Sequence, residues 1–300
     1  MIRRLLWVIV VLQLPLAAAQ TPARYVDRAQ LMRDLTTLAS PAFEGRRTGT
    51  PGALKARQWI VDQFRDARLT PAGTQEYLQP FTVRDADAAN VIGRVTGREP
   101  GARALVVTAH YDHLGVRNGM IYPGADDNAS GVVTLLAAGR YFRANAPRHP
   151  MLFAALDSEE QGHRGARALL DSRLMERRGT AMNVNLDMVS RSDRRELYAA
   201  GTSFAPWLRP ILEDVQSRAG VKILFGHDRP SPPAALEDWT HQSDHGPFHD
   251  AGIAWVYFGV EDHPDYHQPS DTSGRVNAAF FGDAADTIIE ALRAIDEAVD

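Results

Sequence analysis

The sequence has 300 residues, of which 44% are hydrophobic and 23% are charged, and this is enough to bury a full hydrophobic core. Its formal net charge is −4 with histidine neutral, and its lysines and arginines form no cluster, which argues against a nucleic-acid-binding protein. It contains no cysteine, so disulfide bonds are excluded in any compartment.

The first 19 residues have the layout of a secretory signal peptide. Arg3 and Arg4 form a basic start, Leu5–Leu12 is an apolar run, and small residues lead to a predicted cleavage after Ala19. A membrane anchor is the alternative, but spanning a bilayer takes about 20 apolar residues. We therefore expect a secreted or periplasmic protein with no stable membrane anchor after cleavage, and one domain over residues 20–300.

Two helices are predicted in the N-terminal part of this domain. Three leucines of residues 26–38 fall on one helical face. Thr50 and Pro51 have the pattern of a helix N-cap followed by proline at the first helical position, and apolar residues continue at helical spacing to Phe64. The Gly-Arg-Arg-Thr-Gly segment at 45–49 is predicted to be a loop with a solvated arginine pair.

From residue 90 onwards, short apolar runs alternate with longer helical patterns. The predicted strands are Asn90–Val95, Ala104–Ala109, Met151–Leu156, Met182–Leu186 and Ala254–Phe258. The predicted helices are Gly131–Ala144, Gly165–Leu170, Pro206–Ala219 and about 278–299. This alternation predicts an α/β fold of three layers, α/β/α, in which a mostly parallel mixed sheet has helices on both faces.

Polar residues suited to metal binding follow these strands, where ligands bind in such sheets. The segments are His110-Tyr111-Asp112, Asp157-Ser158-Glu159-Glu160, Asp187, and His263 with Tyr266 and His267. A further segment, Gly124–Gly131, is acidic and leads into a helix. Each segment alone is typical of an ordinary turn, helix cap or surface histidine. Their occurrence at successive strand ends favours a metal site.

The charges of these side chains suit a pair of divalent ions. Two Zn²⁺ ions bring four positive charges, and a bridging hydroxide with three carboxylates, from Asp127, Glu160 and Asp187, would balance them. His110 and His267 add neutral nitrogen ligands. Ligand sets of oxygen and nitrogen without thiolate suit zinc, with Co²⁺ or Mn²⁺ as substitutes. The carboxylate of Asp112 is predicted to accept the other imidazole N–H of His110.

With these residues in this order, the sequence resembles the co-catalytic di-zinc aminopeptidases. This metallopeptidase family has glutamate carboxypeptidase II and glutaminyl cyclases among its relatives. The resemblance runs from about residue 35 to the C-terminus. The matching segments are 45–49, His110–Asp112, Gly124–Gly131, Asp157–Gly162, Asn185–Met188, Ser243–His245, and Tyr266-His267 with Asp271-Thr272. The resemblance implies that residues 20–300 are a zinc-peptidase catalytic domain acting on peptides.

The family pattern implies a role for each ligand position. His110 and Asp187 would hold one zinc, Glu160 and His267 the other, and Asp127 would bridge both. In the Gly-Ala-Asp-Asp segment, the bridging position lies three residues before the serine of Ser-Gly, which selects the second aspartate.

Two further residues have implied catalytic roles. Glu159 would be the general base for a hydroxide activated by the two zinc ions, and Tyr266 would help to stabilise the oxyanion. Neighbouring side chains of an extended strand point in opposite directions. The backbone must therefore bend near Glu159 if both it and Glu160 are to reach the site. Ser243, Asp244 and His245 are interpreted as supporting structure.

The remaining candidates have less specific interpretations. His113, His163, His241 and His263 fit no motif position and are predicted to be structural or surface residues. The pair Arg194-Arg195 is predicted to be solvated, and Pro230–Pro233 to be a loop near the substrate rim.

Three alternative functions stay open at the level of the sequence. A carboxypeptidase or dipeptidase of the same family would share the ligands, since neither fold nor metals fix which end of a peptide is cut. A glutaminyl cyclase would use a single zinc. A non-catalytic ectodomain would lack one or more ligands, whereas all five ligand positions and Glu159 are present.

Overall fold

The computed structural model describes residues 23–299, apart from residue 176 and residues 230–236. The predicted signal peptide lies outside the described residues, and so does the proline-rich stretch at 230–233. Among the helices of the described part, none is both long and apolar enough to cross a membrane.

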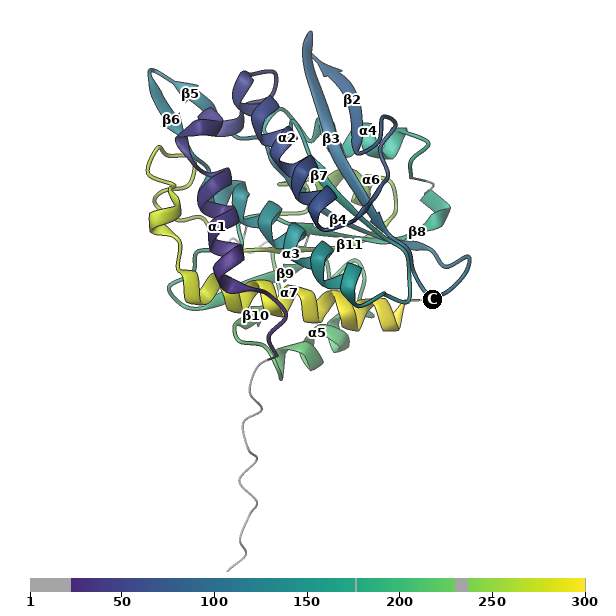
Figure 1. Cartoon of the computed structure of the whole chain (residues 1–300). Coiled ribbons are helices and arrows are strands. Elements are labelled where there is room, and N and C mark those ends of the chain that lie inside the picture. The colour runs from purple at the N-terminus through teal and green to yellow at the C-terminus, as the bar shows by residue number, and fades with distance from the viewer. Residues whose placement is uncertain (1–22, 176, 230–236, 300) are drawn as a thin grey trace, which may run out of the picture.

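A nine-stranded mixed sheet forms the centre of the molecule (Figure 1). Its strands are β1 (Thr70–Pro71), β2 (Leu78–Val83), β3 (Ala86–Val95), β4 (Ala104–His110), β7 (Met151–Leu156), β8 (Thr180–Leu186), β9 (Glu196–Ala200), β10 (Lys222–Leu224) and β11 (Ala254–Gly259). The spatial order is β1-β3-β7-β4-β8-β11-β9-β10, and β2 pairs with β3 outside this path. A separate hairpin consists of β5 (Gly115–Arg117) and β6 (Met120–Tyr122).

The four central strands β7, β4, β8 and β11 all run parallel to one another. They are flanked by antiparallel neighbours, β3 beside β7 and β9 beside β11. The predicted mostly parallel mixed sheet is therefore confirmed, and the carboxyl ends of its four central strands meet along one edge.

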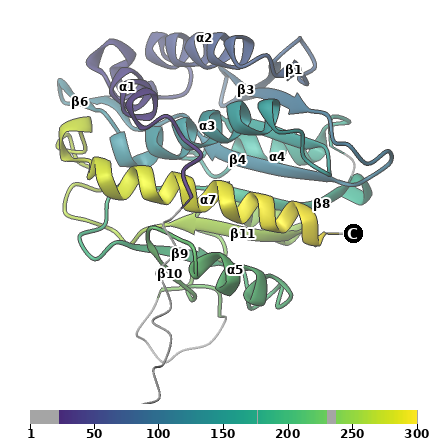
Figure 2. The same cartoon turned by 60° about the horizontal axis from the view of Figure 1, so that its bottom comes forward.

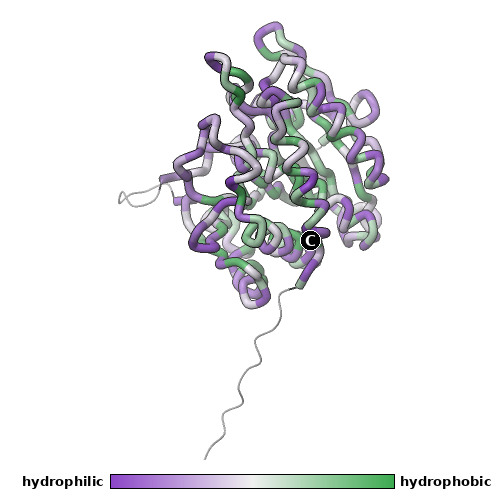
Figure 3. The backbone as a smooth tube through the Cα atoms, turned by 60° about the vertical axis from the view of Figure 1, so that its left-hand side comes forward, coloured by the Kyte–Doolittle hydropathy of each residue, from purple (hydrophilic) through white to green (hydrophobic). Residues whose placement is uncertain are grey.

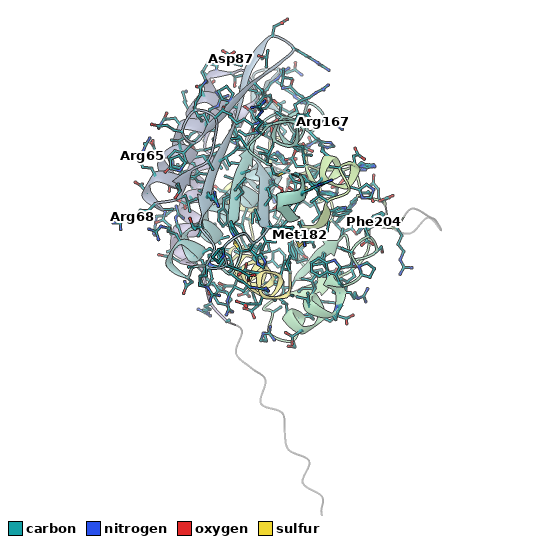
Figure 4. The ribbon with its side chains drawn as sticks, turned by 90° about the vertical axis from the view of Figure 1, so that its right-hand side faces the viewer. Arg65, Arg68, Asp87, Arg167, Met182 and Phe204 are labelled. Atoms are coloured by element: carbon teal, nitrogen blue, oxygen red, sulfur yellow. The ribbon has the colours of Figure 1, made fainter. Side chains whose placement is uncertain are left out.

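Helices cover both faces of the sheet (Figure 2). One face carries α1 (Arg28–Leu38), α2 (Pro51–Asp66), α3 (Gly131–Ala144) and α7 (Ala278–Ala298), with α5 (Leu208–Gln216) packed against α7. The other face carries α4 (Arg164–Asp171) and α6 (His245–Asp250). Shorter helical turns are η1 (Pro41–Arg46), η2 (Ala125–Ser130), η3 (Arg177–Gly179) and η4 (Ser273–Arg275). In the side view of Figure 4, Arg65 and Arg68 lie on one side of the sheet, Arg167 lies on the other, and Met182 lies between them.

The hydrophobic core has two parts because successive residues of a strand face opposite sides of the sheet. In β4, Val107 packs into the larger cluster under α1, α2, α3 and α7, while Val106 packs into the smaller cluster under α4 and α6. In β7, Phe153 and Leu152 divide in the same way. This double burial explains why the central strands are continuous apolar runs. Figure 3 shows the hydrophobic segments gathered inside the molecule and the hydrophilic ones on its outer turns.

The predicted central strands and the predicted helices are all present, with bounds that differ by a few residues. Thr50 is the N-cap of α2, and its side-chain oxygen accepts a hydrogen bond from the Ala53 N–H. Strand β2, which contains Pro80, was not predicted from the sequence. Proline is tolerated there because β2 pairs only with β3 and so lies at an edge.

Candidate metal centre

The predicted site residues lie together at one edge of the sheet, beyond the carboxyl ends of its parallel strands. His110 is the last residue of β4 and pairs in register with Leu156, the last residue of β7. Glu159 and Glu160 follow β7, and Asp187 directly follows β8. His267 lies in the loop beyond β11. The predicted convergence of these side chains is therefore present in the structure.

A first group of possible ligands consists of His110, Asp127 and Asp187, all buried. The Nε2 atom of His110 lies 3.4 Å from Oδ1 of Asp127 and 3.3 Å from Oδ1 of Asp187. Nitrogen and oxygen atoms at these separations can share one metal ion at ordinary Zn–N and Zn–O bond lengths.

A second group uses the other carboxylate oxygen of Asp127. Its Oδ2 lies 3.0 Å from Nε2 of His267, and Oε1 of Glu160 lies 3.4 Å from the same nitrogen. A residue without a predicted role joins them, because Nδ1 of His113 lies 2.9 Å from Oε1 of Glu160. Each of the two groups has its ligand atoms within 4.8 Å of one another. Asp127 belongs to both groups, which is the position predicted for a bridging ligand.

The loop that carries Asp127 is held by hydrogen bonds from several directions. The carboxylate of Asp271 accepts hydrogen bonds from the backbone N–H groups of Asp126 and Asp127. Asn128 donates to the carbonyl of Leu186 at the end of β8 and accepts from Gly131 at the start of α3. These bonds tie η2 to the sheet edge, so the Asp127 carboxylate has a fixed position.

The backbone bends after β7, as the sequence predicted. Ser158 has φ 63°, a left-handed conformation that ends the extended strand. The Glu159 N–H then donates to Oδ1 of Asp112 at 3.0 Å, and the carboxylate of Glu159 lies 3.2 Å from Nε2 of His163. The bend allows Glu160 to join the second ligand group while Glu159 stays outside both groups.

Asp112 supports His110 through a different atom from the one predicted. Its backbone carbonyl lies 3.1 Å from Nδ1 of His110, whereas its carboxylate Oδ1 lies 3.8 Å away. The carboxylate is engaged by the Glu159 N–H. The carbonyl thus fixes His110 with its Nε2 toward the carboxylates, and the Asp112 side chain holds the bend that carries Glu159.

Asp187 is oriented by the segment that resembles a supporting motif. Ser243 donates a hydrogen bond of 2.7 Å to Oδ2 of Asp187, which leaves Oδ1 facing His110. Asn185 in turn donates to the Ser243 hydroxyl at 2.9 Å. His245 is also buried, and its Nε2 lies 2.8 Å from the carbonyl of Trp239. Ser243 and His245 thus contact neighbouring structure, as interpreted from the sequence.

Electrostatic interactions in the two groups are strong because the side chains are buried. Burial alone would raise the pKa of Asp127, but the imidazoles of His113, His110 and His267 hold it well below its usual value. Burial likewise opposes ionisation of Glu160, yet His113 and His267 lower its pKa to about 2. Both carboxylates are therefore ionised and suited to binding a cation.

Glu159 differs from its neighbour. Burial, together with Asp187 and Glu160, raises its pKa to about 8 although His110 opposes the shift. Burial also raises the pKa of Tyr266 well above its usual value, helped by Asp127 and Asp187, so its phenol stays protonated. The ring of Tyr266 stacks on that of His267 with centroids 4.0 Å apart. Both residues thus lie beside the ligand groups without belonging to either.

One interpretation of an individual residue was wrong. Arg46 is fully buried, since its guanidinium donates to backbone carbonyls at Leu38, Tyr111, Pro123 and Gly124, whereas Arg47 is exposed as predicted. His113, predicted to be a structural or surface residue, is buried and belongs to the second group. Arg195 pairs with Asp283 and keeps 42% of its side chain exposed.

Two further histidines also contact the surroundings of the site. His163 reaches Glu159, and Nε2 of His263 lies 3.0 Å from Oδ2 of Asp126. The sequence offers one signal for His113, namely its position three residues after His110 in His-Tyr-Asp-His. The sequence offers no comparable signal for Arg46. A surface loop can have the same composition as a buried segment whose arginine donates hydrogen bonds to several backbone carbonyls.

Comparison with known proteins identifies the family. The family model described as peptidase family M28 matches residues 90–292, which include all the ligand candidates and Glu159. The chain belongs to peptidase family M28. This membership confirms the family predicted from the sequence and, with it, the prediction of a hydrolase.

Curated relatives have names that agree with the family. Aminopeptidase YwaD of Bacillus subtilis is 29% identical over 269 residues, which cover 84% of this chain and 53% of that protein. A probable zinc metalloprotease of Pyrenophora teres f. teres is 29% identical over 208 residues, covering 63% of this chain and 42% of the relative. The chain thus spans about half the length of the curated relatives it matches.

Solved structures share the fold. BSAP, a zinc aminopeptidase from Bacillus subtilis, has a TM-score of 0.72 at 18% identity, with 91% of this chain and 95% of that chain covered. A glutaminyl cyclase of Bacteroides thetaiotaomicron bound to N-acetylhistamine has a TM-score of 0.69 at 15% identity, with 91% and 99% covered. At these identities the likeness supports the fold alone, and it confirms the predicted α/β architecture.

Proposed function

We propose that the protein is a zinc-dependent aminopeptidase that removes N-terminal residues from peptides with two metal ions. The observation that carries this proposal is the pair of ligand groups that share Asp127. Two adjacent ions bridged by a carboxylate are characteristic of hydrolytic two-metal sites.

The residues fit zinc in number and kind. His110 and Asp187 would hold one ion, Glu160 and His267 the other, and Asp127 would bridge them. The donor atoms are nitrogen and oxygen without thiolate, which suits zinc and also Co²⁺ or Mn²⁺. Oε1 of Glu160 is buried and has no hydrogen-bond partner among the described residues, although its pKa favours the ionised form. A cation at this position would satisfy that oxygen.

The neighbouring side chains then supply proton transfer and charge stabilisation. Bound zinc ions provide a Lewis acid for the peptide carbonyl and a hydroxide nucleophile near neutral pH. Glu159 is placed beside the ligands to accept a proton during attack and to pass it to the leaving amine. Its pKa is raised toward the working range of a general base. The protonated phenol of Tyr266 is available to donate a hydrogen bond to the oxyanion.

The choice of the N-terminal end of the substrate rests on the relatives and not on charge. The three ligand carboxylates and a hydroxide would balance two Zn²⁺ ions. Burial raises the pKa of Glu159 to about 8 and that of Asp244 to about 7, so neither carboxyl adds a full negative charge near neutral pH. The aminopeptidase among the curated relatives supports action at the N-terminus.

The proposal includes export from the cytoplasm. Its support is the basic, apolar and small-residue pattern of the first 19 residues, which is that of a cleaved signal peptide. Secretion or periplasmic location would place the enzyme among extracellular or periplasmic peptides.

A substrate screen tests the proposal directly. The purified chain, after chelation and addition of zinc, is assayed on aminoacyl p-nitroanilides and their N-acetylated forms, on N-acetylated peptides with a free C-terminus, on peptides with a blocked C-terminus and on a peptide with N-terminal glutamine. We expect cleavage wherever the N-terminus is free, and none where it is acetylated. Cleavage of acetylated substrates from the C-terminus would reassign the enzyme as a carboxypeptidase. Cyclisation of N-terminal glutamine without peptide hydrolysis would reassign it as a glutaminyl cyclase.

A further inference from the structure

His113 approaches the same two oxygen atoms as the predicted ligand His267. Its Nδ1 lies 2.9 Å from Oε1 of Glu160 and 3.6 Å from Oδ2 of Asp127. Nε2 of His267 lies 3.4 Å and 3.0 Å from these atoms. The two imidazoles and two carboxylates therefore have their ligand atoms within 4.8 Å of one another, close enough to share one metal ion.

The environment of His113 lacks the hydrogen bonds that a buried imidazole normally has. Neither of its ring nitrogens has a hydrogen-bond partner among the described residues, and the ring is almost completely buried. Leaving a buried polar group unpaired costs roughly 1–3 kcal/mol. A cation coordinated by Nδ1 would compensate this cost at that nitrogen, and it would do the same for Oε1 of Glu160, which has no partner among the described residues either.

The fold holds the His113 ring in this position. Gly124 has φ +54°, and a Cβ atom there would lie 2.6 Å from Cγ and Cδ2 of His113. Only glycine therefore leaves room for the imidazole at this place. On the other side, the rings of His113 and His267 meet edge to face with centroids 5.6 Å apart. The nitrogen that faces the carboxylates is thus fixed by packing.

We propose that His113 is a further ligand, through Nδ1, of the zinc ion that Glu160 and His267 would hold. This inference rests on the proposed two-zinc function. It gives that ion four protein ligands, against three for the ion held by His110 and Asp187. A neutral imidazole leaves the charge balance unchanged. Catalytic zinc ions keep a coordination position open, whereas structural zinc ions have all four filled by protein. The ion held by His110 and Asp187 would therefore be the one that binds water and substrate, and the ion held by His113, Glu160 and His267 would be bound more tightly.

The first test uses the unaltered protein loaded with Co²⁺. Protons on the free nitrogens of metal-bound imidazoles give strongly shifted, solvent-exchangeable NMR signals. His110 and His267 face the site through Nε2 and keep a proton on Nδ1, whereas His113 would keep one on Nε2. Three such signals are expected. Two signals would overturn the proposal for His113 and leave two-metal function intact, whereas failure to bind two ions would contradict the proposed function itself.

The second test compares His113→Gln with His163→Gln, a matched control outside both ligand groups. Zinc binding is measured by calorimetry, with circular dichroism as the check of folding. Changing a residue that only supports a ligand costs about 10–100-fold in metal affinity, so loss of a ligand should weaken one site at least this much. We expect this loss, together with one missing exchangeable signal, for His113→Gln only. Unchanged affinity, or weaker binding with all three signals kept, would overturn the proposal. If His113→Gln does not fold, the signal count of the unaltered protein decides.

Discussion

Glu159 and Glu160 are adjacent in the sequence but have different surroundings. Glu160 lies against two imidazoles that lower its pKa to about 2, whereas burial and neighbouring carboxylates raise the pKa of Glu159 to about 8. Two carboxylates whose pKa values are pushed apart are typical of sites that divide binding and proton transfer between them. The bend at Ser158 is what makes the division possible.

This difference predicts distinct effects of two equivalent substitutions. Glu159→Gln keeps the shape of the side chain but cannot accept a proton, so kcat should fall by about 10²–10⁴-fold with little change in KM. Both zinc ions should remain bound. Glu160→Gln should instead weaken one metal site, and added zinc should partly restore its activity. Metal analysis and steady-state kinetics on both variants check this. If Glu159→Gln loses a metal while Glu160→Gln keeps two, the two roles are exchanged.

At the residue scale, the sequence predicted side chains that follow a motif and missed those defined by packing. The five predicted ligands were identified because each lies in a recognisable motif. His110, Glu160 and Asp187 lie at or just beyond strand ends, Asp127 lies in the turn before α3, and His267 lies in the loop beyond β11. The position of His113 in the second group was not predicted, because it depends on the space left by Gly124 and on the approach of His267 from a distant loop. Neither is visible in the local pattern.

At the scale of elements, the central strands were predictable because they are buried on both faces and so are continuously apolar. Strands β9 and β10 were missed, since they contain five and three residues and show little periodicity. The helical turn η1 was not predicted either, and it ends with the buried residues Gly45 and Arg46, whereas residues 47–49 of the predicted loop lie in no helix or strand.

Arg46 in η1 connects several elements around the site. Its guanidinium donates to the Leu38 carbonyl at the end of α1, and to carbonyls at Tyr111, Pro123 and Gly124 beside the ligands. Burial lowers its pKa to about 10, although Asp127 and Asp271 oppose the shift, so the group stays charged at neutral pH. The Gly124 carbonyl also accepts a hydrogen bond from the Ala129 N–H, so removal of the Arg46 side chain would take the donor away from the other three carbonyls.

We expect Arg46→Ala to lower the free energy of unfolding by about 3–5 kcal/mol, because it removes charged hydrogen bonds and leaves buried carbonyls unpaired. The neighbouring exposed Arg47 provides a matched control, and Arg47→Ala should stay within about 0.5 kcal/mol of the unaltered protein. Urea unfolding followed by fluorescence and circular dichroism measures both. Equal effects of the two substitutions would contradict the inference that the hydrogen bonds of Arg46 to these carbonyls stabilise the fold.

At the scale of the whole molecule, the ligand candidates come from segments far apart in the chain. They lie at the ends of β4, β7 and β8, in the turn before α3 and in the loop beyond β11. The three-layer arrangement could be predicted because alternating strands and helices permit few architectures. The pairing of β9 antiparallel to β11 could not, because the order of edge strands depends on long-range contacts without a local signal.

Because the ligands join these distant segments, metal binding should stabilise the whole fold. A ligand that binds only the folded state at about 1,000 times its dissociation constant contributes about 4 kcal/mol. For a domain of this size such a change shifts Tm by roughly 8–16 °C. We expect EDTA to lower Tm of the unaltered protein by about this amount, and added zinc to restore it.

The Asp127→Ala variant is the control for this last prediction, because loss of the shared carboxylate weakens both sites at once. Its Tm should be nearly insensitive to EDTA and to zinc, while the unaltered protein responds to both. Differential scanning calorimetry on the two proteins, with and without chelator, makes the comparison. An equal response of the two proteins would mean that the stabilising metal lies elsewhere, and no response of either would mean that the fold does not depend on the proposed ions.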